Sequence, residues 1–184
     1  MILPIYAYGD PVLKKKASPI EKDHPGLKEL IANMYETMYA SHGVGLAAPQ
    51  IGLSLRLFVT DGSPFEEDEV KDFKQVFINP QIVEEAGDPW KFNEGCLSIP
   101  HVREDVSRKE TVLIEYYDED WNFRRELFSG LAARIIQHEY DHIEGVLFTD
   151  RISPLRRKLL NKRLSDISSG NVKVDYKMRF PSQR

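Results

Sequence analysis

His138, Glu139 and His142 form an HExxH pattern inside the stretch 130–148. In a helix the two histidines lie one turn apart on one face, so both can reach a single metal ion. Glu139 is offset from that ion but can reach a water molecule held there, which suits it to carry protons. The spacing therefore indicates metal-dependent hydrolysis. The alternative is a helix that carries two ordinary histidines.

A catalytic metal site usually has three protein ligands and one position open to water. The extended pattern HExxHxxGxxH fails because position 148 is Phe, and no Glu follows Glu144. We therefore expect the third ligand upstream. The candidates there are His24, His42, His101 and the only cysteine, Cys96, with Asp150 as a weaker downstream candidate.

Cys96 lies in a turn-like Glu-Gly-Cys sequence, outside any apolar periodicity. A lone intracellular cysteine is most often a small buried apolar residue, and a nucleophile with a histidine base is another alternative. One ion held by Cys96, His138 and His142, with Glu139 acting on its water, accounts for all four residues together.

Gln50 ends a segment in which Gly43 and Gly45 allow close approach of the backbone to a ligand. A side-chain amide at this place could donate a hydrogen bond to a developing oxyanion. A simple turn between a helix and a strand is the alternative.

The elements that must position these residues follow from periodicity. Apolar residues at helical spacing predict a helix from about Pro25 to Tyr39, a second over the HExxH stretch, and a third from about Leu155 to Ile167. Ser129 is the expected N-cap of the HExxH helix, and Gly145 its expected C-terminal stop.

Alternating apolar and polar residues predict strands over 53–60, 75–78 and 81–85, and a hairpin from 111–117 and 122–127. We expect a turn at 86–89 and an acidic surface loop at 61–74. The sequence thus predicts a single α+β domain over residues 1–184, with mainly antiparallel β-sheets around a central HExxH helix and a C-terminal helix.

Composition is that of a globular protein, since 41% of the 184 residues are apolar and 29% are charged. We expect no signal peptide, because the first residues lack a basic region, and no membrane span, because the apolar runs are too short. A lone cysteine excludes an intramolecular disulfide. The cytoplasm of a bacterium is the expected location.

Charge is distributed unevenly along the chain. Residues 151–184 contain ten basic and two acidic residues, a net charge of +8, whereas the whole chain carries −4, which leaves −12 for the first 150 residues. A basic C-terminal helix and tail at 155–184 could contact an anionic partner, or it could be an ordinary solvated surface.

Three segments resemble, in order, the motifs of peptide deformylases: GVGLAAPQ at 43–50, EGCLS at 94–98 and QHEYDH at 137–142. The segment GDPVL at 9–13 is also similar to that family. The resemblance extends from about Ile5 to Pro154. It says least about the structure and role of the residues after Pro154.

The resemblance implies an enzyme that removes the formyl group from the N-terminal formylmethionine of nascent polypeptides and releases formate. It implies one divalent ion held by Cys96, His138 and His142, with Fe(II) the usual metal and nickel, cobalt or zinc as substitutes. It assigns Glu139 as general base and later acid, and it assigns the Gln50 side chain and the Leu97 backbone N–H to the oxyanion.

For the substrate, the resemblance implies that the backbone binds along Gly45 and that the methionine side chain enters an apolar pocket. We expect the stem of Arg134 to pack there while its head reaches outward, Arg103 to lie at the entrance, and Glu94 to pair with Arg108. The expected substrate-binding residues are Gly43, Val44, Gly45, Leu46, Glu94, Gly95, Arg103, Leu131, Arg134 and Ile135.

Two other functions remain open on the sequence. One is a different metal-dependent amidase or peptidase. The other is a metal-stabilised domain without catalysis that binds the ribosome or RNA through its basic tail. The partners expected of the deformylase are formylmethionyl nascent peptides and, through the C-terminal helix, the ribosome, with no membrane and no sequence-specific nucleic acid.

Overall fold

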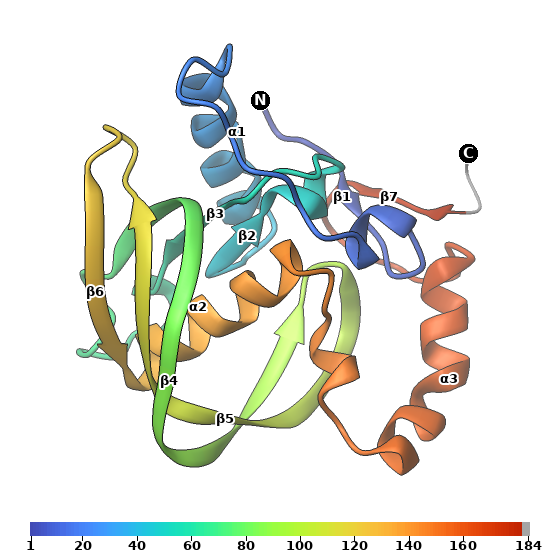
Figure 1. Cartoon of the computed structure of the whole chain (residues 1–184). Helices are drawn as coiled ribbons and strands as arrows, with labels where there is room; N and C mark the ends of the chain where they lie inside the picture. The colour runs from blue at the N-terminus through green and yellow to red at the C-terminus, as the bar shows by residue number, and fades with distance from the viewer. Residues whose placement is uncertain (182–184) are drawn as a thin grey trace.

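The computed structural model describes residues 1–181 and shows an α+β architecture (Figure 1). Its helices are α1 (Leu27–Ala40), α2 (Gly130–Ile143) and α3 (Pro154–Ser168). A five-stranded sheet consists of β2 (Gly45–Ala47), β3 (Leu57–Asp61), β4 (Lys74–Cys96), β5 (Ile99–Tyr117) and β6 (Phe123–Ser129). A two-stranded sheet consists of β1 (Ile5–Tyr6) and β7 (Met178–Arg179).

The five-stranded sheet has the order β2-β3-β4-β5-β6, and every neighbouring pair is antiparallel. Its long strands β4 and β5 bend past α2, which lies inside their curve, while α1 lies on the side of β2 and β3 (Figure 1). The expected antiparallel sheet around a central HExxH helix, with a helix towards the C-terminus, is confirmed.

The turn expected at 86–89 is wrong, because β4 continues through it. Ala86 pairs with Thr111 and Pro89 pairs with Lys109, so two residues of β4 oppose a single residue of β5. Gly87 has a φ of 81°, a conformation that favours glycine and lets the strand bulge instead of reversing. The turn-like composition therefore marks a β-bulge.

Helix α2 begins and ends where the sequence indicates, but its first turn is capped from elsewhere. The side chain of Ser129 makes no capping bond, and the N–H of Leu131 instead donates to Oε2 of Glu69, 3.3 Å away in the acidic loop. At the other end Gly145 has a φ of 76°. The N–H of Val146 donates to the carbonyl of Asp141, 2.9 Å away, in a Schellman-type arrangement.

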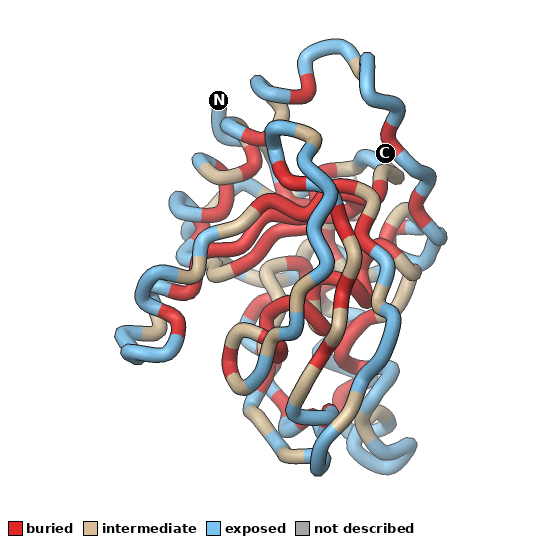
Figure 2. The backbone as a smooth tube through the Cα atoms, turned by 60° about the vertical axis from the view of Figure 1, so that its left-hand side comes forward, coloured by how far each residue is buried: buried red, intermediate tan, exposed pale blue. Residues whose placement is uncertain are grey.

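One face of α2 packs into the concave side of the sheet. Ala133, Ile136 and Ile143 are fully buried there against Phe58 and Phe77. Buried residues follow the central strands and helix, whereas the outer turns are exposed (Figure 2). The opposite face of α2 is therefore turned away from this core, and His138 and His142 lie on that opposite face.

Strands β1 and β7, which come from opposite parts of the sequence, lie side by side near α3 (Figure 1). β1 and β7 pair in parallel, with Ile5 opposite Met178. Helix α3 buries Leu160, Leu164 and Ile167 but leaves Leu155 and Leu159 exposed. Among residues 1–181, none of the helices has the length and apolar character needed to cross a membrane.

Candidate active site and metal centre

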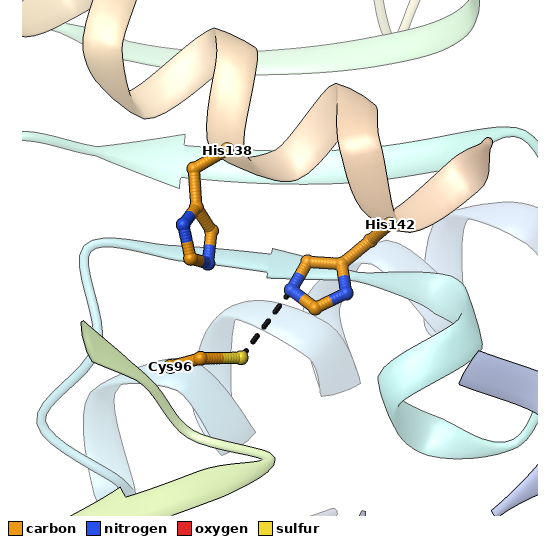
Figure 3. Close-up of side chains that lie close together, drawn as sticks. All are labelled: Cys96, His138 and His142. Carbon is orange, nitrogen blue, oxygen red and sulfur yellow. Dashed lines mark hydrogen bonds between the residues drawn. The ribbon is translucent and has the colours of Figure 1, made fainter. Parts of the chain in front are cut away.

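Cys96, His138 and His142 converge at one point. Each offers one ligand atom, and the three atoms lie within 4.8 Å of one another. Sγ of Cys96 is 3.4 Å from Nε2 of His142. The two imidazoles extend from one face of α2 towards the end of β4, where Cys96 lies (Figure 3). The helical spacing thus brings the histidines together, and the sheet supplies the cysteine.

Glu94 fixes the orientation of His138. Its Oε1 lies 2.9 Å from Nδ1 of the imidazole, which leaves Nε2 facing the convergence point. Hydrogen bonds of 2.8 and 3.0 Å from Arg108 confirm the expected ion pair with Glu94. Burial alone would raise the pKa of Glu94, but the hydrogen bonds from His138 and Arg108 hold that pKa well below its usual range. The carboxylate therefore stays charged and holds the ring in place.

The expectation that the head of Arg134 reaches outward is wrong. The side chain is only 2% exposed. Its Nη1 donates to Oε2 of Glu94 at 2.9 Å and to the carbonyl of Val106 at 2.8 Å, and the guanidinium lies over the ring of Trp90. A buried carboxylate nearby explains this direction, since Arg134 finds its counter-charge inside the protein.

Glu139 is buried beside the histidines and has one carboxylate oxygen, Oε2, with no hydrogen-bond partner among the described residues. Burial raises the pKa of Glu139 to about 7, against the opposing effect of His138. A buried carboxylate with a pKa near neutrality and a free oxygen can both accept and release a proton. Gly45 makes room for it, because a Cβ at that position would lie 2.5 Å from Oε1 of Glu139.

The donor set fits a divalent transition metal. A thiolate and two imidazole nitrogens are three ligands of the kind that catalytic metal sites use, with a further position left for water. The unpartnered Oε2 of Glu139 in the same cavity is placed for a group bound at that position. His24 and Asp150 are not part of this cluster, and neither are His42 and His101.

Gln50 presents its amide nitrogen to the site. Its Oε1 accepts a 3.0 Å hydrogen bond from the N–H of Ala47, which fixes the amide orientation. Nε2 lies 3.2 Å from Oγ of Ser98 and 3.5 Å from Sγ of Cys96. A buried, oriented N–H donor beside the three candidate metal ligands is the arrangement that an oxyanion requires.

A cavity of about 430 Å³ opens beside these residues. Leu46 and Leu131, both expected at the substrate, are not among its lining residues. Leu46 is fully buried in the cluster of α1 and β3. The expected residues that do line the cavity are Gly43, Val44, Gly45, Gln50, Glu94, Gly95, Cys96, Leu97, Arg103, Arg134, Ile135, His138 and Glu139.

The cavity also has walls that sequence reasoning missed. Phe65 reaches it from the acidic loop and packs edge-on against Phe92 at a centroid distance of 6.0 Å. Tyr176 reaches it from the C-terminal segment. Apolar residues alternate with charged ones from Val172 to Phe180, so period-2 patterning could have indicated an extended segment there. No comparable signal distinguishes Phe65 in its loop.

Comparison with known proteins shows the family of this chain. Residues 2–158 match the family model described as polypeptide deformylase. A peptide deformylase of Christiangramia forsetii is 58% identical, over 100% of this chain and 98% of its own.

Solved structures give the same result. The peptide deformylase of Legionella pneumophila has a TM-score of 0.82 at 38% identity, over 95% of this chain and 99% of its own. A class I type b peptide deformylase of Acinetobacter baumannii, with Met-Ala-Ser bound, has a TM-score of 0.76 at 34% identity, over 83% of this chain and 99% of its own. The chain therefore belongs to the polypeptide deformylase family.

Proposed function

We propose that Cys96, His138 and His142 hold one divalent ion per chain and that Glu139 moves the proton in the reaction. As a peptide deformylase, the chain removes the formyl group from the N-terminal formylmethionine of nascent polypeptides. The observation that carries the residue assignment is the convergence of the three ligand atoms beside the free oxygen of Glu139.

The bound ion would acidify a water molecule and polarise the formyl carbonyl. Glu139 takes a proton at Oε2 as the water oxygen bonds to the formyl carbon. The negative charge that develops on the formyl oxygen is met by Nε2 of Gln50 and by the N–H of Leu97; one such donor is worth about 3 kcal/mol. Glu139 then gives the proton to the methionine nitrogen as the C–N bond breaks, and formate and a free amine result.

The substrate backbone lies along β2 at Gly45, in the manner of an added strand. The methionine side chain enters the end of the cavity near Val44, Phe92 and Ile135, while Arg103 stands at the entrance. Met-Ala-Ser bound in the Acinetobacter baumannii relative supports this peptide class, because that sequence is what remains after deformylation of formyl-Met-Ala-Ser.

The metal is Fe(II) in the cell, with zinc, nickel and cobalt as substitutes. Thiolate and imidazole ligands accept all of these ions, so the donor set supports the group of metals and not one member. Metal analysis of protein purified without oxygen tests the choice. Zinc as the only metal in active protein prepared in this way would contradict it.

Formate release from formyl-Met-Ala-Ser tests the function, with Glu139→Ala and the unformylated peptide in parallel. We expect release by the native protein, loss of about 10²- to 10⁴-fold in the variant, and no cleavage of the unformylated peptide. Cleavage of that control peptide would favour a peptidase. A folded, metal-loaded sample without formate release would contradict the deformylase assignment.

We also propose that the enzyme works in the bacterial cytoplasm and contacts the ribosome through α3. The exposed side of this helix carries Leu155 and Leu159 together with Lys158 and Arg163, which suits an anionic surface. K158E/R163E should reduce co-sedimentation with ribosomes at low salt, whereas Lys28→Glu on α1 should not. Equal co-sedimentation of both variants would contradict the contact.

A further inference from the structure

The segment that carries Leu97 is a two-residue turn between β4 and β5, in which Cys96 pairs with Ile99. Both carbonyl groups of this turn are held from outside the hairpin. The hydroxyl of Tyr176 donates to the carbonyl oxygen of Leu97 at 2.7 Å. The backbone N–H of Tyr8 donates to the carbonyl oxygen of Ser98 at 2.8 Å.

These two donors come from opposite ends of the chain and are joined to each other. Tyr8 follows β1 and Tyr176 precedes β7, and those strands form the terminal sheet. The N–H of Ile5 donates to the carbonyl of Lys177, and the N–H of Ala7 to that of Arg179, both at 2.9 Å. The turn beside the metal ligands therefore rests on a hydrogen-bonded platform made from both termini.

The residues 171–177 before β7, here called the C-terminal strap, are attached to both rims of the cavity. His101 Nε2 lies 2.6 Å from the carbonyl oxygen of Lys173, and His42 Nε2 lies 3.2 Å from Oδ2 of Asp175. Both histidines have left-handed backbones, with φ of 64° and 62°. Both histidines line the cavity, so the strap is attached to its edge at two points.

We propose that Tyr176 is a positioning residue for the oxyanion site. By holding the carbonyl of Leu97, its hydroxyl restricts rotation of the turn and aims the Leu97 N–H at the formyl oxygen. This inference rests on the proposed role of that N–H. A donor to an oxyanion must be held within a few tenths of an ångström of its working place before charge develops, and a two-residue turn without external bonds lacks that restraint.

Tyr176→Phe tests the inference, because it removes one oxygen and keeps the ring, which packs against the same core cluster as Leu97. We expect kcat for formyl-Met-Ala-Ser to fall about three- to tenfold, the effect of one lost neutral hydrogen bond, with KM within about twofold of the native value. Tyr6→Phe is the matched control. It removes a hydroxyl that accepts from Arg179 at 3.1 Å in the same terminal sheet, away from the turn, and should leave kcat unchanged.

The backbone amide of Leu97 gives a readout independent of activity. In ¹⁵N-labelled, zinc-loaded protein, Y176F should shift the Leu97 amide resonance and speed its hydrogen exchange, and Y6F should do neither. Native kcat together with an unmoved Leu97 amide in Y176F would overturn the proposal. An equal loss of kcat in both variants, or a loss in Y176F that follows a fall in melting temperature, would overturn it in favour of general packing.

Failure of the proposed function looks different from failure of this inference. If the proposed function is wrong, the native protein releases no formate. The Leu97 amide resonance alone then decides whether Tyr176 holds the turn. A shift confined to Y176F supports the positioning role, and its absence overturns it.

Discussion

Oε1 of Glu94 lies 2.9 Å from Nδ1 of His138, so a carboxylate on β4 orients one of the proposed metal-ligand histidines on α2. The same carboxylate is the common counter-charge of Arg108 and Arg134. Glu94 thus couples the geometry of the metal centre to the charge balance of the core.

Glu94→Gln should lower metal affinity about 10- to 100-fold, the usual loss when a partner of a ligating histidine is altered. It should also lower the free energy of unfolding by about 3 kcal/mol, because the buried guanidinium of Arg134 loses its negative partner and that of Arg108 keeps only Asp141. Competition with a chelator measures the first effect, and urea unfolding the second. Glu104 on β5 pairs with Arg156 on α3, away from the histidines. Glu104→Gln should therefore leave the metal affinity unchanged. Equal affinity of the native protein and E94Q would refute the coupling.

Gln50→Ala should lower kcat about 10²- to 10³-fold with a small change in KM, because in the proposed mechanism the amide acts on charge that exists only in the transition state. Ser98→Ala removes the hydroxyl that contacts the amide of Gln50 and should cost less, about three- to tenfold. Steady-state kinetics at matched metal content measures both. A larger loss in S98A than in Q50A would reverse the assignment.

Gly45→Ala should disable the proposed base, Glu139, and leave metal binding intact. The new Cβ would lie 2.5 Å from Oε1 and 2.8 Å from Cγ of Glu139, whose buried side chain must then move. A displacement of about 1 Å costs roughly 10²-fold in rate. Gly26→Ala is the contrast, since a Cβ there has no neighbour within 4 Å and only the φ of 71° is strained. It should lower stability and leave kcat intact, and an unchanged kcat in G45A would argue against this packing.

Asp150 provides a pH-dependent contribution to stability. Burial would raise its pKa, but hydrogen bonds from Lys14, the N–H of Leu147 and Arg157 hold it below the ordinary 3.8. Because the folded-state pKa is the lower one, the contribution is complete above about pH 4 and is lost as the pH falls through the folded-state value. Asp150→Asn should therefore lower the melting temperature at pH 7, and the difference from the native protein should shrink below pH 4.

The control for this comparison is Asp68→Asn, whose carboxylate is fully exposed. Its melting curve should follow that of the native protein at every pH. A difference between D150N and the native protein that grows on acidification would contradict the sign of the shift.

Local chemistry made part of the site predictable. The spacing of His138 and His142 needs only helix geometry, and the search for a third ligand left few candidates, among them Cys96. The pair of Glu94 and Arg108 came from family resemblance, since no periodicity connects a strand residue to a partner 14 positions away.

Other features depend on packing between distant segments and were not predictable from local pattern. Phe65 lies in a loop whose composition indicates only a solvated surface, and its place in the cavity depends on Phe92. The cap of α2 is the carboxylate of Glu69, which accepts a hydrogen bond from the N–H of Leu131, 62 residues later in the chain. The side chain of Arg134 points inward because it pairs with the buried carboxylate of Glu94. The sequence around Arg134 does not show that this carboxylate lies nearby.

The pairing of Ile5 with Met178 also sets an order of assembly during synthesis. A chain that emerges vectorially from the ribosome can form the hairpin of β4 and β5 and then α2 before residue 178 is available. The terminal sheet must wait, and closing so long a loop is the last and entropically most costly of these steps. The three candidate ligands can therefore meet in a nascent chain whose Leu97 turn still lacks its external supports, and the final alignment of the site must wait until β7 has left the ribosome.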